Sequence, residues 1–355
     1  MALYAILKGL GVGGADAVLM PGYTCVVVPS AVHFLGARAI YADVEAASYN
    51  VTQSTLEDAW RKHRGPRPKA LIIQHTYGIP VEAEAILAWA RTEGLPVIED
   101  CAHVMGSHYR GTPCGELGEA AFFSSQWSKP VTTGLGGWAV VNSPSLAERL
   151  GHVYNEFALP NFSESNLLRL QFYAHKLLFR PRLFWTLMDL YRTLGHAGLV
   201  IGSSSDQELA LHQPERYSLR MSAFQEKQLE KALTRSADII EHRTAIGALY
   251  TDYLSRAGLP TPAIPDNSRA VLVRYPVLVD DKAAKLRLAQ EQRLEVGDWF
   301  VSPLHPWLDN LEALGYQPGS CPVAEELCRH VVNLPTHGRI SLGEAKKIAD
   351  FVLDG

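Results

Sequence analysis

The chain has 355 residues, of which 47% are apolar and 20% are charged, as is ordinary for a soluble globular protein of one or two domains. Its formal net charge of -4 gives no reason to expect nucleic acid or an anionic membrane as a partner. The five cysteines form no CxxC pair and no zinc spacing, and an odd number does not suit a disulfide framework. We therefore expect a reducing, cytoplasmic compartment.

The first twenty residues are apolar enough to be compared with a secretion signal. However, Lys8 interrupts the apolar run, no basic region precedes it, and Asp16 follows closely. This pattern predicts a core helix followed by a strand. Because no run of about 18 uncharged apolar residues occurs, we predict no membrane span.

Short apolar runs alternate with helical patterns over the first 143 residues. The helical patterns cover 24–36, 54–64 and 82–94, and the second opens with a cap of the Ser-x-x-Glu type at Ser54. Strands are expected at 16–22, 37–44, 69–75, 95–103, 120–125 and 137–143. This alternation predicts an α/β fold with a mostly parallel sheet that is covered by helices on both faces.

Ligands of such sheets bind beyond the carboxyl ends of the strands. The polar residues that follow the predicted strands are therefore candidates for a site. They are His75, Asp100, His103 and Ser124.

Residues 155–212 break this rhythm and form an insertion with two expected helices within 166–195, divided near Pro181. Long amphipathic helices follow over 219–258. A strand at 270–280 and helices beginning near 281 and 341 complete the chain. We expect a large domain over 1–235 and a smaller α+β domain over 236–355.

The segment 124–138, SSQWSKPVTTGLGGW, holds Lys129, the only lysine between Lys69 and Lys176. The hydroxyls and glycines around it suit a phosphate, although a Gly-Gly before a strand is more often only a tight turn. Asp100 ends a buried strand, where it either pairs with a cation or caps a helix, or serves as a functional carboxylate. Together, Lys129, Asp100 and Ser124 could supply the amine, the carboxylate and the phosphate ligand that pyridoxal 5'-phosphate needs.

Residues 97–141 resemble the core motif of the DegT/StrS-type family of pyridoxal-phosphate sugar aminotransferases. In that motif, Glu-Asp-x-Ala-His/Gln leads to Ser-x-x-x-x-Lys and then to Gly-x-Gly-Gly. Other segments similar to the family are 21–32, 75–80, 216–233, 302–306 and 333–337. The resemblance covers nearly the whole chain. It implies the fold type I of pyridoxal-phosphate transferases, with a sheet of the seven-stranded type, and a homodimer with shared active sites.

The resemblance also implies a role for each candidate residue. Lys129 would be the covalent anchor of the cofactor and the proton shuttle, and Asp100 would pair with the pyridine nitrogen. His103 would approach the ring hydroxyl or the ring face. The remaining cofactor-binding residues would be Ser124 at the phosphate, Thr24 and Cys25 in the strand-to-helix turn, and Ser218, where the family usually has an asparagine that reaches the phosphate from the partner subunit.

The implied activity is transfer of an amino group from glutamate to a nucleotide-linked keto-sugar, in the synthesis of surface polysaccharides or of secondary-metabolite sugars. Some relatives dehydrate sugars and have histidine at this position, so the presence of Lys129 disfavours that activity here. Two departures keep a cofactor-poor regulatory or scaffold protein as an alternative. Cys25 stands where an aromatic residue usually stacks on the ring, and the phosphate loop that the family has before residue 2 would lie upstream of Met1.

The insertion is the third departure. Its expected helices mix leucines and basic residues with aromatic rings at Phe172, Tyr173, Phe179, Phe184, Trp185 and Tyr191. This composition suits either a hairpin packed on the domain or subunit interface, or a helix pair at a membrane surface. We favour packing, because core and interface helices are commoner, and expect the hairpin to cover the active-site mouth or the interface and to help select the sugar.

Overall fold

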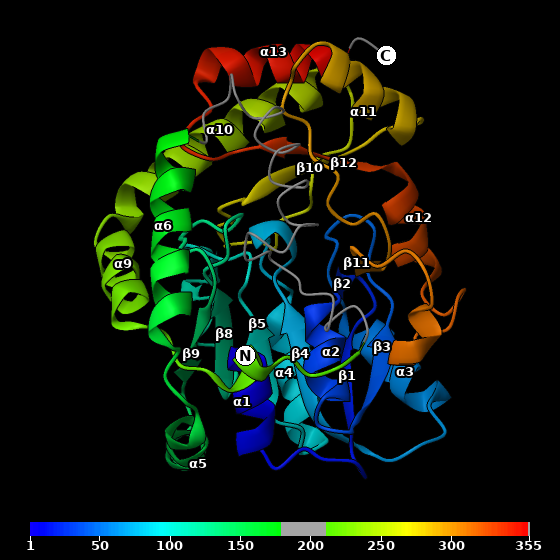
Figure 1. Ribbon diagram of the computed structural model, residues 1–355. Helices are drawn as coiled ribbons and strands as arrows, with labels where there is room; N and C mark the ends of the chain where they lie inside the picture. Colours follow the sequence, from blue (N-terminus) through cyan, green and yellow to red (C-terminus); the bar gives the residue numbers. More distant parts are fainter. Residues whose placement is uncertain (179–210, 354–355) are drawn as a thin grey trace.

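A six-stranded sheet forms the base of the molecule in the computed structural model, which describes residues 1–178 and 211–353 (Figure 1). The strand order is β3-β1-β4-β5-β8-β9, and every neighbouring pair is parallel except β8 with β9. The strands are β1 Ala17–Pro21, β3 Arg38–Ala42, β4 Pro68–Gln74, β5 Val97–Asp100, β8 Ala120–Ser124 and β9 Gly137–Val141. This confirms the mostly parallel α/β sheet expected from the sequence.

All six strands coincide with the six predicted apolar runs. The expectation of a seven-stranded sheet came from the family resemblance alone, and the described residues give six. In this part of the chain no further apolar run pairs with either edge strand, β3 or β9.

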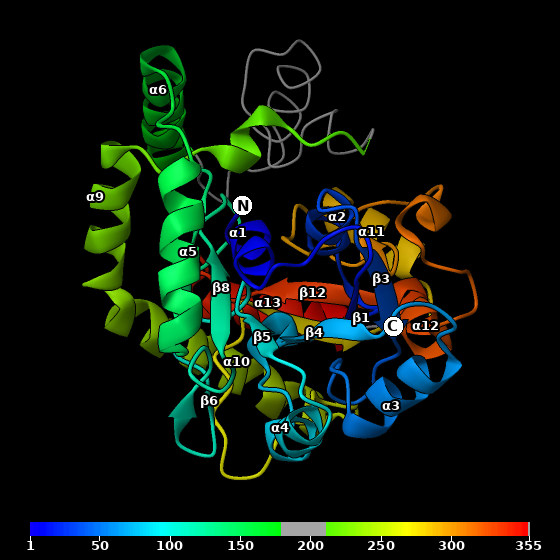
Figure 2. The ribbon, with the colours of Figure 1, turned by 90° about the horizontal axis from the view of Figure 1, so that it is seen from below.

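Helices cover both faces of the sheet (Figure 2). One face carries α1 Ala2–Gly9, α2 Val27–His33 and α5 Pro144–Glu156, and the other carries α3 Gln53–Lys62 and α4 Ala83–Thr92. Successive residues of a strand point to opposite faces. Accordingly Val18 joins the apolar cluster under α1 and α2, whereas Leu19 joins the cluster under α3 and α4.

The start of α3 differs from the prediction. The cap is Thr52, whose hydroxyl accepts a hydrogen bond from the N–H of Thr55, while the Thr55 hydroxyl accepts one from the N–H of Thr52. Ser54 lies inside the helix. Thr52 has the extended backbone that a capping residue requires. This conformation makes Thr52, and not Ser54, the cap of the helix.

A second, smaller layer lies above the carboxyl ends of the parallel strands (Figure 1). Its two strands, β10 Arg274–Leu278 and β12 Val331–Pro335, are antiparallel. Its helices are α10 Ser236–Arg256, α11 Lys282–Glu291, α12 Pro322–His330 and α13 Leu342–Leu353. One apolar cluster runs from Leu19 of the large sheet to Tyr275 and Leu334 of this layer, so the two layers share a core. A domain boundary at residue 235, between the helix α9 Ala223–Leu233 and α10, remains a proposal.

The segment 24–36, predicted as one helix, begins instead with the short strand β2 Thr24–Cys25. β2 is parallel to β11 Leu304–His305, with backbone N–H groups of Thr24 and Val26 donating to the carbonyls of Pro303 and His305. The remaining short elements are η1 Thr76–Gly78, β6 His108–Tyr109, β7 Thr112–Pro113, η3 Glu215–Ser218 and η4 Leu311–Leu314.

The described part of the insertion contains the helix α6 Phe162–Leu178, which packs against α9 Ala223–Leu233. Phe172 makes an edge contact with Phe224 of α9, and His175 contacts Trp127 in the segment that precedes Lys129. The first predicted helix is thus confirmed. The second, with Phe179, Phe184, Trp185 and Tyr191, lies outside the described residues. Among the described helices, none is long and apolar enough to cross a membrane.

Candidate active site

Lys129 and Asp100 meet at the carboxyl ends of the parallel strands. Asp100 is the last residue of β5, and Lys129 follows β8, the strand beside it. The two groups are close enough for the charge of each to shift the pKa of the other. The sheet therefore brings together the two residues predicted to be catalytic.

Asp100 is a buried carboxylate, with only 4% of its surface exposed. Burial raises its pKa to about 6, while the N–H of Ala102, at 2.9 Å from Oδ1, and the positive charge of Lys129 oppose this rise. Asp100 forms no ion pair within residues 1–178 and 211–353. A cation placed beside it would relieve the cost of burying its charge.

Lys129 is half-buried, and burial lowers the pKa of its amine. Cys25 and Asp100 oppose this shift, and the positive charge of Arg274 adds to it. A lysine with a lowered pKa is more often neutral near pH 7, which is what a nucleophilic or proton-accepting amine requires.

The segment around Lys129 is held by its own hydrogen bonds. The Ser125 hydroxyl bonds the Thr133 hydroxyl at 2.7 Å, and Gln225 of α9 donates to the carbonyl of Leu135 at 2.6 Å. Gly136 has φ +120°, and a Cβ atom there would come within 2.8 Å of the Met221 side chain. The glycine run is thus a turn whose conformation is fixed by specific contacts, and it holds the backbone near Lys129 in place.

His103 lies near Lys129, and its ring is neutral. Burial lowers its pKa well below the ordinary value, and the charges of Lys129, His305 and Arg274 lower it further. Its Nδ1 atom accepts a hydrogen bond from the backbone N–H of Tyr77 at 3.1 Å. The single proton of the ring is therefore on Nε2, which makes that atom a hydrogen-bond donor.

His75, the fourth strand-end candidate, does not serve a ligand in this structure. It is fully buried, and its Nε2 donates to Glu99 at 3.0 Å while its Nδ1 accepts from the N–H of Val81. Glu99 also accepts hydrogen bonds from the backbone N–H groups of Gly115, Leu117 and Gly118.

The ligand atoms of His75, Glu99 and Cys101 lie close enough together to hold a metal ion. However, both ring nitrogens of His75 and both carboxylate oxygens of Glu99 already have hydrogen-bond partners. Burial works against ionisation of Glu99, but His75 and the backbone donors hold its pKa below the ordinary value. We interpret this cluster as a structural support under the site.

Thr24 and Cys25 lie on β2, at the edge of the site. The hydroxyl of Thr24 donates to Gln74 at 2.7 Å, so its one proton is committed and the residue positions the strand. Cys25 is half-buried and close enough to Lys129 to act on its pKa. The structure therefore places a thiol, and no aromatic ring, at this position.

Ser124 ends β8 and is half-buried, five residues before Lys129. Ser218 ends η3 beside α1, where the neighbouring Tyr217 contacts Tyr4 and Phe34. Within the described part of one chain, no interaction joins Ser218 to Lys129 or Asp100. This is compatible with the expectation that Ser218 acts in the site of a partner subunit, which remains a proposal.

Two residues of the smaller layer also border Lys129, and the sequence analysis missed both. The indole of Trp299 stacks on His103, with ring centroids 5.0 Å apart, and the Lys129 amine lies 4.9 Å from its centroid. Arg274 also lies over this ring, at 4.6 Å. Arg274 had a visible signal in the sequence, since it is the one charged residue inside the apolar run AVLVRYPVLV.

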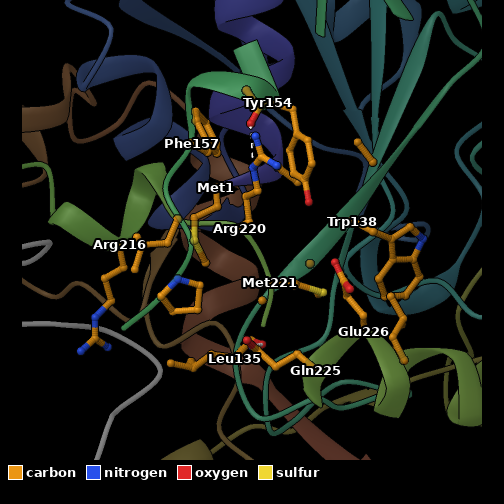
Figure 3. A pocket seen from close by; sticks show the side chains of 18 of the residues that line it. Met1, Leu135, Trp138, Tyr154, Phe157, Arg216, Arg220, Met221, Gln225 and Glu226 are labelled. Atoms are coloured by element: carbon orange, nitrogen blue, oxygen red, sulfur yellow. Dashed lines mark hydrogen bonds between the residues drawn. The ribbon is translucent and has the colours of Figure 1, made fainter. Parts of the chain in front are cut away.

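A separate hollow of about 570 Å³ lies between the start of α1, β9, α5 and α9 (Figure 3). It is mainly apolar and includes Leu135, Trp138 and Met221, whereas Lys129 and Asp100 do not line it. Arg220 closes one side by donating to the carbonyl of Tyr154 at 3.1 Å and lying over its ring. The hollow is therefore distinct from the site around Lys129.

Comparison with known proteins identifies the family. The model of the DegT/DnrJ/EryC1/StrS aminotransferase family matches residues 1–176 and 186–353. The chain belongs to this family. The resemblance seen in the motifs is thereby confirmed.

Individual relatives either match only part of the chain or match nearly all of it at low sequence identity. The chain is 38% identical to the L-glutamine:scyllo-inosose aminotransferase of Streptomyces griseus over 152 residues, which are 43% of this chain and 35% of that enzyme. It is 24% identical to the UDP-N-acetyl-3-dehydro-alpha-D-glucosamine 3-aminotransferase of Acidithiobacillus ferrooxidans over 99% of this chain and 80% of that protein. The match to the first of these enzymes thus spans only about a third of its length.

The fold is also that of a solved family member. The crystal structure of a DegT DnrJ EryC1 StrS aminotransferase from Brucella abortus matches with a TM-score of 0.75 at 23% identity, over 99% of this chain and 82% of that one. At this identity the similarity establishes the fold alone.

Proposed function

We propose that the protein is a pyridoxal-phosphate-dependent aminotransferase that transfers the amino group of glutamate to a nucleotide-linked keto-sugar, in surface polysaccharide or secondary-metabolite sugar biosynthesis. The observation that carries the proposal is the pairing of a half-buried amine of lowered pKa, Lys129, with the buried carboxylate Asp100. Membership in an aminotransferase family, and the sugar substrates in the names of the two relatives above, support it. A cytoplasmic homodimer is part of the same proposal.

The residues present fit the cofactor. Asp100 forms no ion pair with a described residue, and a protonated pyridine nitrogen would supply one. Ser124 would hold the phosphate, and Nε2 of His103 would donate to the ring hydroxyl. When bound, pyridoxal phosphate supplies an electron sink for the carbon that loses its proton.

The chain's own groups would then divide the work. Lys129 would anchor the cofactor, and after the donor amine displaces it, the free amine would take the α-proton of the donor and return it at another carbon. Asp100 would keep the proton on the ring nitrogen by staying ionised. Because both groups are largely shielded from water, the interaction between their charges is stronger than at the surface.

The test is the absorption spectrum of the purified protein with pyridoxal phosphate. The proposal predicts a band near the visible edge that shifts when glutamate is added. A protein that forms no such band, or whose band does not respond to any amino acid, would instead be the cofactor-poor regulatory or scaffold protein. The sugar would next be sought among nucleotide-linked ketoses, by mass spectrometry of the aminated product.

A further inference from the structure

The helix α6 has two apolar faces, and only one of them packs against the rest of the described chain. On the inner face Leu168 and Phe172 are buried, and Phe172 contacts Phe224 of α9. The opposite side also carries large apolar side chains, which at 3.6 residues per turn fall within about 140° of arc. We call this side the outward face of α6, and its apolar members are Phe162, Leu167, Leu170, Tyr173 and Leu177.

The apolar side chains of the outward face are exposed to solvent. Their exposed fractions are 82% for Phe162, 37% for Leu167, 69% for Leu170, 42% for Tyr173 and 68% for Leu177. Of the 14 large apolar residues that are exposed in the described chain, six lie between residues 159 and 177. Single exposed apolar residues are ordinary, but a contiguous patch marks an interaction surface. Figure 2 shows α6 at the periphery of the molecule, where such a surface is accessible.

The charges on the outward face are all positive. Arg169 and Lys176 are exposed and lie two turns apart along one edge of the apolar stripe. Neither of them forms an ion pair with a residue that the structure describes. Glu164, the one carboxylate of α6, lies on another side of the helix, where it lines the hollow beside α1. The outward face is therefore apolar and cationic, although the whole chain has a net charge of -4.

We propose that the outward face of α6 docks on the surface of a membrane that contains anionic lipids. The helix would lie parallel to the surface, with its apolar side chains in the headgroup layer. Arg169 and Lys176 would extend along the edge of the helix towards the lipid phosphates. The contact is peripheral, because no described helix is long and apolar enough to cross a membrane. This proposal does not depend on the proposed aminotransferase activity.

A lipid surface fits the outward face better than a second copy of the same face does. Two copies placed face to face would cover the apolar stripe, but they would also bring four cations together without a carboxylate. An anionic membrane supplies an apolar layer and a negative surface charge at once. The sequence led us to favour packing of the insertion on the domain or interface. The inner face of α6 does pack in this way, and the outward face remains uncovered.

The first experiment is co-sedimentation of the full chain with lipid vesicles. One set of vesicles contains equal parts of phosphatidylglycerol and phosphatidylcholine, and the other contains phosphatidylcholine alone. At low ionic strength the protein should bind the anionic vesicles at least about tenfold more tightly, and about 0.5 M salt should remove most of this difference. Absence of binding to the anionic vesicles would overturn the proposal. Equal binding to both sets would overturn its electrostatic basis.

Two kinds of variant assign the binding to the outward face. The double variant Leu170→Ser and Leu177→Ser should weaken binding to anionic vesicles by about tenfold or more, because less apolar surface enters the headgroup layer. Leu308→Ser is the matched control, since Leu308 is exposed to the same extent as Leu177 but lies in the smaller layer, and it should bind as the wild type does. Equal losses in the double variant and the control would overturn the proposal.

The charge variants test the second property of the face. Arg169→Gln and Lys176→Gln should each weaken binding to anionic vesicles about fivefold, whereas Lys62→Gln on α3 should not. If the double leucine variant does not fold, these two variants decide, and unchanged binding in both would overturn the proposal. Light scattering identifies the competing occupant. A wild type that ignores vesicles, together with a double leucine variant of lower oligomeric mass, would show that the outward face joins two copies of the chain.

Discussion

The imidazole of His75 and the carboxylate of Glu99 are joined by a hydrogen bond of 3.0 Å, and neither side chain is exposed to solvent. Glu99 directly precedes Asp100 on β5, so the two carboxylates point to opposite faces of the strand. One of them is saturated with hydrogen bonds and supports the structure. The other accepts a single described hydrogen bond, from Ala102, and is left for chemistry.

Replacing Glu99 with glutamine should destabilise the protein by about 2–4 kcal/mol. The amide NH2 group would face backbone N–H groups of 115–118 or the imidazole, all of which require an acceptor. Urea unfolding measures the change. The exposed Glu148, changed to glutamine in the same way, should leave the free energy of unfolding nearly unaltered, and an equal loss in both variants would contradict this account.

Lys129→Ala should abolish amino transfer and leave the fold intact, because the side chain is half-buried and no described hydrogen bond depends on its amine. Borohydride reduction of the wild-type protein with pyridoxal phosphate, followed by peptide mapping, should place the pyridoxyl group on Lys129. Circular dichroism of the variant checks the fold. A pyridoxyl group on another lysine would refute the assignment.

Asp100→Asn should stabilise the cofactor-free protein at pH 7. The pKa of this carboxyl is raised to about 6, so its charged form is disfavoured in the folded state, and this carboxyl contributes less stability as the pH rises from about 4 to 6. The amide avoids that cost, which is up to about 3 kcal/mol. Urea unfolding at pH 7 and pH 5 should show the gap between variant and wild type narrowing at the lower pH. A constant gap would indicate that Asp100 is not the group responsible.

The same variant should keep the cofactor but transfer its proton slowly, because an amide cannot hold the proton on the ring nitrogen. Single-turnover kinetics with glutamate measure this step. A near-normal rate would remove Asp100 from the proposed chemistry.

The protein should be a homodimer in solution, because Ser218 lies beside α1 and no interaction among the described residues joins it to the Lys129 of its own chain. Light scattering at micromolar concentration measures the mass. Mixing Lys129→Ala subunits with a Ser218 variant of lowered cofactor affinity should restore one intact site per mixed dimer. A fully active monomer would contradict the shared site.

Gln171→Met should raise the free energy of unfolding by about 1–2 kcal/mol, because both polar atoms of the Gln171 amide on α6 are buried without a hydrogen-bond partner in the described structure. Gln290→Met, at an exposed position, is the matched control. If Gln171→Met is instead destabilising, a bound water or ligand satisfies this amide. If Gln171→Met changes the KM of the sugar substrate and leaves that of the amino donor unaltered, the expectation that the insertion helps to select the sugar is supported.

Most of the sheet and the core of the site could be predicted from the sequence. The strands are local apolar runs, of which Asp100 ends one and Lys129 follows another. Because the carboxyl ends of parallel strands lie at the same edge of a sheet, the two residues could be predicted to lie close together. The parts that were missed depend on distant partners. β2 exists only because residues 304–305 lie beside it, and Trp299 and Arg274 reach the site only after the smaller layer folds over the sheet. The capping of α3 by Thr52 depends on a backbone angle that the sequence does not record.

The pairing of β2 with β11 also limits how the smaller layer can move relative to the site around Lys129. The N–H groups of Thr24 and Val26 hold residues 303–305 against the large layer, only a few residues from Trp299. A hinge motion that moved the smaller layer as one rigid body would have to break these two hydrogen bonds. We therefore expect a bulky substrate to enter by rotation of individual side chains, Trp299 first among them, while the backbone pairing of β2 with β11 stays intact.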